Sequence, residues 1–211
     1  MVLLISEIHF TTKSYIKIPN YRIYDTRHPD GTAHGGTAII IKIGIKHHLH
    51  DHYNLDHLQA TSVVIEDWIG PLTLAAVYCP PKHNIKAEQF QRFFATLGQK
   101  FLAGGDYNAK HTQWGSRLTT PRGRKLLKAM QAEHLSHVST GEPTYWPSDR
   151  RRVPDLIDFG VVKHIPLRTL HADPSLDLSS DHSPVLISVH SKILPQPCPQ
   201  TTSTKHKLGG F

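Results

Sequence analysis

The amino-acid sequence predicts an α+β fold in which mixed β-sheets form a sandwich and helices pack on the outside. Short apolar, β-branched runs recur along the 211 residues, and clusters of Gly, Pro, Asn and Asp separate them, which is typical of strands and turns. Helical spacing of apolar residues occurs in few, scattered places. A composition of 38% hydrophobic and 19% charged residues is typical of a globular chain, and the length suits one domain with its own core.

Each predicted strand is a short apolar run bounded by turn-forming residues. In chain order the runs are Val2–Ile5, Thr37–Ile43, Ala60–Ile65, Leu72–Tyr78, Lys100–Ala103, Leu156–Val162 and Pro184–Val189.

Two stretches predict amphipathic helices, Lys86–Leu97 and Arg122–His134. Apolar residues recur in them at helical spacing. The first carries Phe90, Phe93, Phe94 and Leu97, and the second carries Leu126, Leu127 and Met130.

The chain changes character near its end. Residues 191–211 are rich in Pro, Ser, Thr and Lys and show no periodicity, which predicts a linker or tail after a domain at residues 1–190. The sequence contains no internal repeat. Dinucleotide-binding, P-loop, common zinc and serine-hydrolase motifs are also absent, which argues against those functions.

The charge and the cysteine content indicate the kind of partner and the redox compartment of the protein. The sequence has 24 Lys+Arg against 17 Asp+Glu, a net charge of +7 that favours a polyanionic partner, although a mildly basic soluble protein fits equally well. Cys79 lies in an apolar run and Cys198 in a Pro-rich segment, so we expect no structural disulfide and a reducing compartment. No apolar stretch approaches the ~20 residues that cross a bilayer, so no membrane association is expected.

Four acidic residues stand near the ends of predicted strands. Glu7 follows VLLIS, Asp106 ends KFLAGG, Asp158 lies within DLIDFGVV and Asp181 opens SDHSPVLI. Carboxylates at strand ends project toward the rim of a sheet, where they can converge on a hard divalent cation. For each acid taken alone, a solvated or loop-capping role is the favoured interpretation.

Two motifs are more specific than single acids. In GGDYNAKHTQWGS, Asp106 and Asn108 are two residues apart and should point the same way, so that one can orient water while the other donates to an oxyanion. Gly104 and Gly105 are expected to allow a tight turn before them. In SSDHSPV, His182 has a neighbouring carboxylate, and a second in DLIDF suits an Asp–His pair.

Taken in order, SE, GGTAIIIK, YCPP, GGDYNAKHTQWGS, PTYWP, DLIDF and SSDHSPV resemble the endonuclease/exonuclease/phosphatase superfamily. Within it, GGDYNAKHTQWGS and PTYWP look most like the apurinic-type endonucleases of jockey-like non-LTR retrotransposons. The resemblance extends from about Val2 to Val189. It implies a DNase I-like, four-layer α/β/β/α sandwich with two mixed sheets flanked by helices.

The resemblance also implies roles for individual residues. Glu7 matches the metal-binding Glu, and Asp181 a second acidic ligand or supporting group. Tyr78 matches a phosphate-contacting Tyr, Asp106 the acid that aligns or deprotonates the attacking water, and Asn108 the phosphate-orienting Asn beside it. Asp158 matches the carboxylate that is paired with the catalytic His, and His182 matches that His.

The implied reaction is hydrolysis of a phosphodiester in double-stranded DNA, assisted by Mg²⁺ with Mn²⁺ as a possible substitute. It would leave a 3′-hydroxyl to prime reverse transcription, with a reverse transcriptase domain in the parent polypeptide and a nuclear location. Two alternatives remain open. One is a phosphatase or phosphodiesterase of the same fold, and the other is a degenerate, non-catalytic remnant.

One departure from the family concerns the start. The family pattern begins with a strand that ends in an Asn-containing turn, whereas this sequence begins at the following strand. We therefore expect the first strand to be missing and one edge of Val2–Ile5 to be unpaired. Such a chain should be poorly soluble and weakly active.

Three weaker signals have less specific interpretations. The run His47–His57 contains alternating His48, His50 and His52, a pattern that would suit a transition-metal site. No Cys or strand-end geometry fixes the spacing of these histidines, so a solvated polar loop is favoured. Arg150, Arg151 and Arg152 predict a basic loop for phosphate contact, or simply a solvated one. Trp114 and Trp146 are interpreted as core residues rather than base-stacking platforms.

Overall fold

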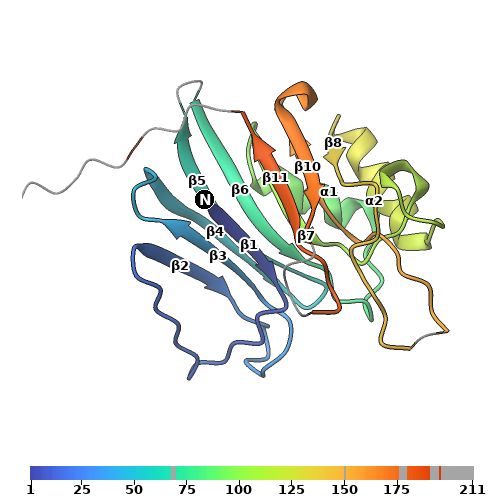
Figure 1. Cartoon of the computed structure of the whole chain (residues 1–211), viewed down its shortest axis with the longest axis horizontal. Helices are drawn as coiled ribbons and strands as arrows, with labels where there is room; N and C mark the ends of the chain where they lie inside the picture. The colour runs from blue at the N-terminus through green and yellow to red at the C-terminus, as the bar shows by residue number, and fades with distance from the viewer. Residues whose placement is uncertain (68–69, 150, 176–179, 191–194, 196–211) are drawn as a thin grey trace, which may run out of the picture.

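The structure is a computed structural model, and it describes residues 1–67, 70–149, 151–175, 180–190 and 195. A six-stranded sheet forms its centre, in the order β4-β5-β6-β7-β9-β8 (Figure 1). Its strands are β4 (His47–Leu55), β5 (Leu58–Asp67), β6 (Gly70–Tyr78), β7 (Phe101–Asp106), β8 (Ser136–Val138) and β9 (Asp158–Lys163). The β6–β7 pair is parallel and the other pairs are antiparallel, so the sheet is mixed.

Two smaller antiparallel sheets form a second layer. One has the order β1-β3-β2, from β1 (Val2–Ser6), β2 (Tyr21–Thr26) and β3 (Thr37–Lys42). The other pairs β10 (Leu170–Pro174) with β11 (Val185–Val189). No described strand pairs with the edge of β1 opposite β3, in line with the unpaired edge predicted from the sequence.

Both α-helices of the described residues pack on one face of the six-stranded sheet. They are α1 (Ala87–Thr96) and α2 (Pro121–Ala132). Phe90, Phe93 and Phe94 of α1 join Leu126 and Met130 of α2 in a core that includes the inward residues of β6, β7 and β9. Two short 3₁₀ helices, Thr112–Trp114 and Leu167–Thr169, complete the described helical segments.

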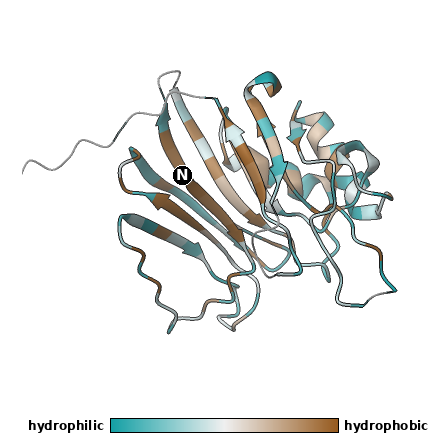
Figure 2. Cartoon of the chain, in the orientation of Figure 1, coloured by the Kyte–Doolittle hydropathy of each residue, from teal (hydrophilic) through white to brown (hydrophobic). Residues whose placement is uncertain are grey.

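The opposite face of the central sheet carries a second core. Ile39 and Ile41 of β3 and Leu102 of β7 are buried in it, and residues of β1, β10 and β11 pack around them. Hydrophobic residues accordingly concentrate on β1, β3 and β11, whereas the loops are more hydrophilic (Figure 2). The two cores lie on either side of one sheet, which is the arrangement of a sandwich.

The structure confirms the predicted α+β sandwich and corrects parts of it. In the described part of the chain there are three layers, because α1 and α2 share one face and no α-helix covers the small sheets. Only the central sheet is mixed. The strands β2, β4, β8 and β10 have no counterpart among the apolar runs of the sequence, and β4 occupies the histidine-rich run for which the sequence favours a loop. The predicted tail lies outside the described residues apart from Pro195, which bridges Ile45.

None of the helices in the described residues has the length and apolar character that crossing a bilayer requires.

Candidate active site

Three predicted site residues lie side by side at one edge of the central sheet. Tyr78 ends β6 and is the register partner of Asp106, which ends β7. Asp106 in turn pairs with Asp158, the first residue of β9. Because register partners on adjacent strands project to the same face, a phenol and two carboxylates are brought together at this rim.

Glu7 reaches the same edge from the second layer. The preceding residue, Ser6, donates its hydroxyl to the Val77 carbonyl at 2.8 Å and accepts the Asp106 N–H at 3.2 Å. These bonds hold the end of β1 against the ends of β6 and β7. Glu7 has a φ of 55°, and its carboxylate forms a hydrogen bond with Tyr78. A positive φ in a non-glycine residue is unfavourable and often marks a functional position.

Gly105 permits this close approach of the two layers. Its φ is 149°, and a β-carbon there would lie 2.0 Å from the Val77 carbonyl oxygen and 2.9 Å from Ser6 Oγ. Any other residue would force β1 and β6 away from β7. The sequence suggested a tight turn at Gly104 and Gly105, but both lie within β7, where close packing requires Gly105.

Asp106 is almost completely buried and holds Asn108 in place. Its carboxylate accepts the Asn108 backbone N–H at 2.7 Å and the side-chain amide at 2.6 Å. Burial and then the negative charge of Asp158 raise the pKa of Asp106 well above its usual range, although the Asn108 backbone hydrogen bond opposes them. A carboxylate of raised pKa is a stronger base, which suits proton transfer from water.

His182 contacts Asp158 directly, with 2.9 Å between Nδ1 and Oδ2. Burial opposes the charged imidazolium, but the hydrogen bond to Asp158 and the charges of Asp158, Asp106 and Asp181 outweigh it and raise the pKa of His182 to about 9. The imidazole also packs against the Tyr145 ring at a centroid distance of 5.0 Å. At neutral pH, His182 is therefore a positively charged donor held in a fixed orientation.

Tyr78 keeps its proton in this setting. Burial raises the pKa of Tyr78, and its hydrogen bond with Glu7 and the charges of Glu7 and Asp106 add to that rise. The phenol is thus a hydrogen-bond donor at the same rim as His182.

The other predicted site residues are more peripheral. Asp181 is exposed and acts on His182 through its charge, while its carbonyl accepts the Trp146 N–H at 2.7 Å. Arg150 lies outside the described residues. Arg151 and Arg152 are exposed, and Arg151 pairs with Asp149 in its own loop at 3.1 Å.

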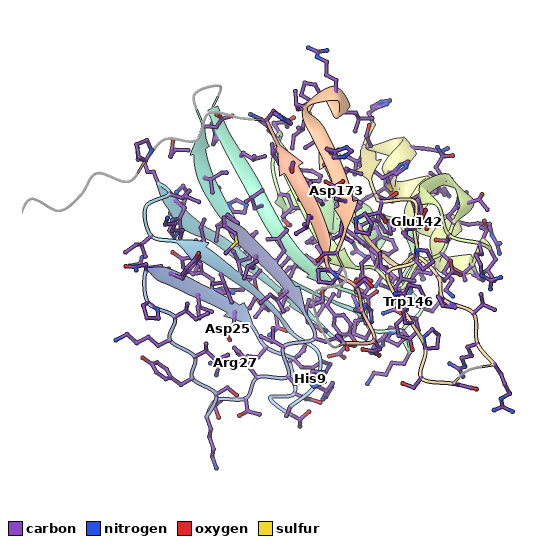
Figure 3. All side chains as sticks on the ribbon, in the orientation of Figure 1. His9, Asp25, Arg27, Glu142, Trp146 and Asp173 are labelled. Carbon is purple, nitrogen blue, oxygen red and sulfur yellow. The ribbon has the colours of Figure 1, made fainter. Side chains whose placement is uncertain are left out.

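The two tryptophans differ from each other. Trp114 is buried in the core, and its indole N–H donates to the Ala109 carbonyl. This confirms its interpretation as a core residue. Trp146 was interpreted in the same way, yet it is 45% exposed and lies among the loops below β10 and β11 (Figure 3). Its indole N–H donates to Ser183 Oγ at 2.9 Å, beside His182.

Sequence analysis missed the residues that position this site. Thr144 Oγ1 accepts the N–H groups of Ile157 and Asp158, which fixes the start of β9. Asp155 is 1% exposed, accepts the Arg117 N–H and pairs with Lys110. Thr144 and Asp155 belong to the motif segments PTYWP and DLIDF, but short polar residues give no pattern that distinguishes a positioning role. Ser6 likewise showed no signal beyond its place before Glu7.

The donor set fits a hard divalent cation. Glu7, Asp106 and Asp158 are carboxylates at one rim, and their mutual repulsion contributes to the raised pKa of Asp106. A cation would neutralise that charge. Mg²⁺ is commonly held by one or two carboxylates while water and phosphate complete its shell, so a cage of many protein ligands is not required.

The histidine-rich run offers no comparable site in the described residues. His52 bonds to Thr26 Oγ1 at 2.9 Å and His50 to the Thr96 carbonyl at 2.9 Å. The group of possible metal ligands found close together in the described part of the chain lies elsewhere, at His28, Asp30 and His34.

Comparison with known proteins gives consistent results. The family model described as "Endonuclease-reverse transcriptase" matches residues 72–186. The RNA-directed DNA polymerase from the mobile element jockey of Drosophila funebris is 35% identical over 196 residues, which cover 93% of this chain and 21% of that protein. A probable RNA-directed DNA polymerase from the transposon X-element of Drosophila melanogaster is 33% identical over 199 residues, which cover 93% of this chain and 22% of that protein. The chain thus spans about a fifth of the length of these curated relatives.

Solved structures share the fold. The endonuclease domain of TRAS1, a telomere-specific non-LTR retrotransposon, superposes with a TM-score of 0.69 at 22% identity, over 82% of this chain and 81% of that one. The catalytic domain of Xenopus laevis APE2 superposes with a TM-score of 0.66 at 14% identity, over 94% and 85%.

Proposed function

This chain belongs to the endonuclease–reverse transcriptase family within the endonuclease/exonuclease/phosphatase superfamily, and we propose that it is a metal-dependent endonuclease acting on double-stranded DNA. The observation that carries the proposal is the convergence of Tyr78, Asp106 and Asp158 on adjacent strand ends, with His182 bonded to Asp158. A phosphodiester needs donors for its oxygens and a base for water, and this rim offers both.

Each residue has a role that follows from its surroundings. Asp106, with its raised pKa, takes a proton from water as the water oxygen attacks phosphorus. His182, held charged by Asp158, donates to a phosphate oxygen, where negative charge develops, and the protonated Tyr78 joins it once its hydrogen bond turns from Glu7 to the phosphate. Asn108, fixed by Asp106, is a further donor. The bond from phosphorus to the 3′ oxygen breaks with its electron pair on that oxygen, which takes a proton from water, leaving a 5′-phosphate and a 3′-hydroxyl.

The proposed metal is Mg²⁺, with Mn²⁺ as a substitute. Glu7 would hold it, with Asp181 as a second acidic ligand or supporting group. When bound, the ion would supply Lewis-acid polarisation of the phosphoryl group.

The parent polypeptide is proposed to carry a reverse transcriptase. Support comes from relatives that are RNA-directed DNA polymerases, of which this chain spans about a fifth. A nick with a 3′-hydroxyl is the primer that such an enzyme needs, and chromosomal DNA as substrate would place the protein in the nucleus.

A plasmid assay tests the function. Supercoiled plasmid should be converted to the nicked form with Mg²⁺, and the nick should be extendable by a DNA polymerase because it carries a 3′-hydroxyl. Excess EDTA should stop the reaction. Release of inorganic phosphate from small esters without nicking would favour the phosphatase alternative, and absence of both activities would favour a non-catalytic remnant.

A further inference from the structure

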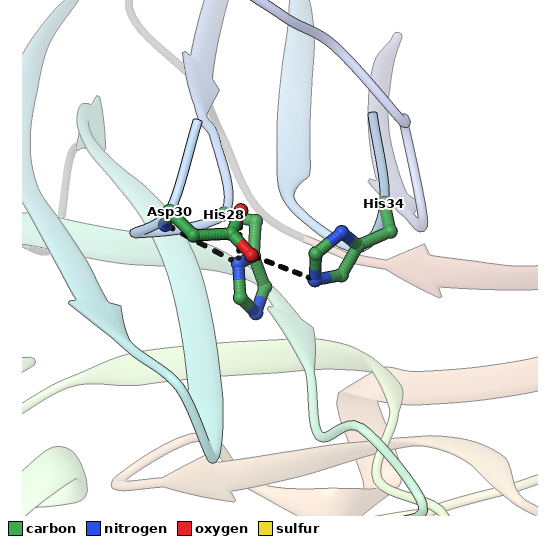
Figure 4. Close-up of side chains that lie close together, drawn as sticks. All are labelled: His28, Asp30 and His34. Carbon is green, nitrogen blue, oxygen red and sulfur yellow. Dashed lines mark hydrogen bonds and ion pairs between the residues drawn. The ribbon is translucent and has the colours of Figure 1, made fainter. Parts of the chain in front are cut away.

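A second cluster of metal-binding side chains lies in the loop between β2 and β3. It consists of His28, Asp30 and His34 (Figure 4). One potential ligand atom from each residue lies within 4.8 Å of the other two. His28 Nδ1 is 2.9 Å from Asp30 Oδ1, and His34 Nε2 is 3.6 Å from Asp30 Oδ2. The centroids of the two imidazole rings are 3.8 Å apart, and the ring planes are tilted by 41°.

Hydrogen bonds within the loop decide which atoms are free to bind an ion. Thr32 donates its backbone N–H and its hydroxyl to Asp30 Oδ1, each at 2.9 Å. Because the hydroxyl hydrogen is given to Asp30, Thr32 Oγ1 accepts from His34 Nδ1–H in their contact at 2.5 Å. The neutral His34 ring then carries its lone pair on Nε2. That nitrogen faces the Asp30 carboxylate, an acceptor facing an acceptor.

One nitrogen of each histidine in this cluster is buried without a hydrogen-bond partner in the described part of the chain. His34 Nε2 and His28 Nε2 are both inaccessible to solvent and have no hydrogen-bond partner among the described residues. The His28 side chain is only 5% exposed, whereas those of Asp30 and His34 are 49% and 43% exposed. A buried nitrogen without a partner is costly. A cation placed between His34 Nε2 and the carboxylate would remove the clash of two acceptors.

Hydrogen bonds from Thr32 to Asp30 Oδ1 orient the carboxylate so that Oδ2 faces His34. The backbone hydrogen bond from Thr32 is the largest cause that lowers the pKa of Asp30, and, although partial burial opposes it, the pKa falls to about 2.

We propose that His28, Asp30 and His34 form a binding site for a divalent transition-metal ion of the zinc class. Two imidazoles and one carboxylate are ligands that suit Zn²⁺, Co²⁺ or Ni²⁺, while Mg²⁺ prefers oxygen. Ligand atoms about 2.0–2.2 Å from a tetrahedral ion lie roughly 3.4 Å apart. The half-exposed Asp30 and His34 can move the short remaining distance toward the fixed His28.

A hydrogen bond already orients the His34 ring as it would in a metal site. A metal-binding imidazole normally donates its other N–H to a neighbouring oxygen, which fixes the tautomer and the ring orientation. The bond from His34 Nδ1 to Thr32 Oγ1 has this form. Three protein ligands would leave a fourth position for water or another group.

An ion bound in this cluster would affect the structure next to the candidate active site. A β-carbon built on Gly35 would lie 3.4 Å from His28 Cδ2 and 3.2 Å from Tyr78 Cε1, so both rings flank the same glycine. The Gly35 carbonyl also accepts the His9 N–H at 3.0 Å, two residues after Glu7. An ion bound here would hold the loop around residues 28–34 in place beside the candidate active site. This site is distinct from the proposed Mg²⁺ site and does not depend on nuclease activity.

Binding of Co²⁺ to the full 211-residue chain tests the proposal. Metal-free protein would be titrated with Co²⁺ in a large excess of Mg²⁺, which occupies all-oxygen sites, while visible absorption of the bound ion is recorded. One saturable site with a tetrahedral-type spectrum is expected, and Zn²⁺ should displace the Co²⁺. If Co²⁺ produced no saturable spectrum, or if Mg²⁺ abolished it, the proposal would be overturned.

Variants assign the signal to these residues. Because His28 is buried and its replacement could disturb folding, the half-exposed Asp30→Asn and His34→Ala carry the test, each expected to weaken binding by at least about 100-fold. Thr32→Val should weaken it by about 10- to 100-fold, because the hydrogen bond that orients the His34 ring is lost. His48→Ala, an exposed histidine on β4, is the matched control and should leave affinity unchanged. Unchanged binding in both Asp30→Asn and His34→Ala, with folding verified by melting, would show that Co²⁺ binds elsewhere.

Discussion

The contact between His182 and Asp158 sets the charge of the candidate site at the level of single residues. Burial alone would favour a neutral imidazole, yet Asp158, with Asp106 and Asp181, raises the pKa of His182 to about 9. Since this pKa lies above the ordinary value of about 6.5, the charged pair stabilises the fold fully below pH ~6.5. That contribution is lost as the pH rises through about 9.

Replacing Asp158 by Asn should lower the pKa of His182. The variant keeps the size of the side chain but removes the negative charge, so burial then dominates. A pH titration of the His182 ring protons by NMR would show the midpoint moving from about 9 toward or below 6.5. Any nicking activity should likewise decline at a lower pH than in the unmodified chain.

The matched control for this change is Asp173→Asn. Asp173 pairs with the exposed His171 at 3.0 Å, so its loss should leave the pKa of His182 unaltered. A His182 midpoint that stayed near 9 in the Asp158→Asn protein would mean that Asp158 does not hold the imidazole charged.

At the level of elements, one side chain of α2 joins the helix to the end of the central sheet. The Arg122 guanidinium donates to the carbonyls of Cys79, Pro80 and Pro81 after β6, and to those of Tyr107 and His83. Arg122 is 8% exposed, so these bonds are formed away from water. The planar guanidinium satisfies several carbonyls at once, which fixes the loops that flank Tyr78 and Asp106.

Arg122→Lys should therefore destabilise the chain although the charge is conserved. A lysine ammonium cannot reach all of these carbonyls, and each buried acceptor left unpaired costs about 1–3 kcal/mol. We expect the free energy of unfolding in urea to fall by about 2–4 kcal/mol. Arg124→Lys, on the exposed side of α2, should change it by less than about 0.5 kcal/mol, and an equal loss in the two variants would contradict the role given to Arg122.

The predictability of each element followed from its burial. Strands such as β3, β5 and β6 are buried along most of their length, so an apolar run marked them in the sequence. The strand β4 is exposed along most of its length and rich in histidine, and backbone pairing with β5 rather than its side chains makes it a strand. The strands β2 and β10 are also only partly buried, which removes the same signal.

In the candidate site too, some residues could be predicted from the sequence and others could not. Its acids and His182 stood in distinctive motifs, whereas Thr144 and Ser6 act through single hydrogen bonds between segments far apart in sequence. The cluster of His28, Asp30 and His34 lies within HPDGTAH, yet alternating polar residues in a loop gave no reason to expect their side chains to converge.

For the whole molecule, the excess of positive charge should govern DNA binding. The net charge of +7 favours a polyanion, and the exposed loop that includes Arg151 and Arg152 lies between the segment of Trp146 and β9. Replacing Arg150, Arg151 and Arg152 together by Ala should weaken DNA binding and flatten its salt dependence. Each lost phosphate contact removes about 0.9 from the log–log slope, so three contacts remove about 2.7.

A charge-matched control separates a local effect from a general one. Lys13, Lys17 and Arg22 are exposed in the three-stranded-sheet region, and their joint replacement by Ala removes the same charge. The slope should change less in this control. If both triple variants flattened the slope equally, the arginine loop would be no more than part of a diffuse positive surface.

The most direct test of the central claim is plasmid nicking by the His182→Ala protein in Mg²⁺. Without the imidazolium held by Asp158, stabilisation of the phosphate oxygens is lost, and the nicking rate should fall by about 100-fold or more while the melting temperature shows that the chain remains folded. His164→Ala, an exposed histidine at the end of β9, should nick at the rate of the unmodified chain. A folded His182→Ala protein that nicks as fast as the His164→Ala control would contradict the proposed active site.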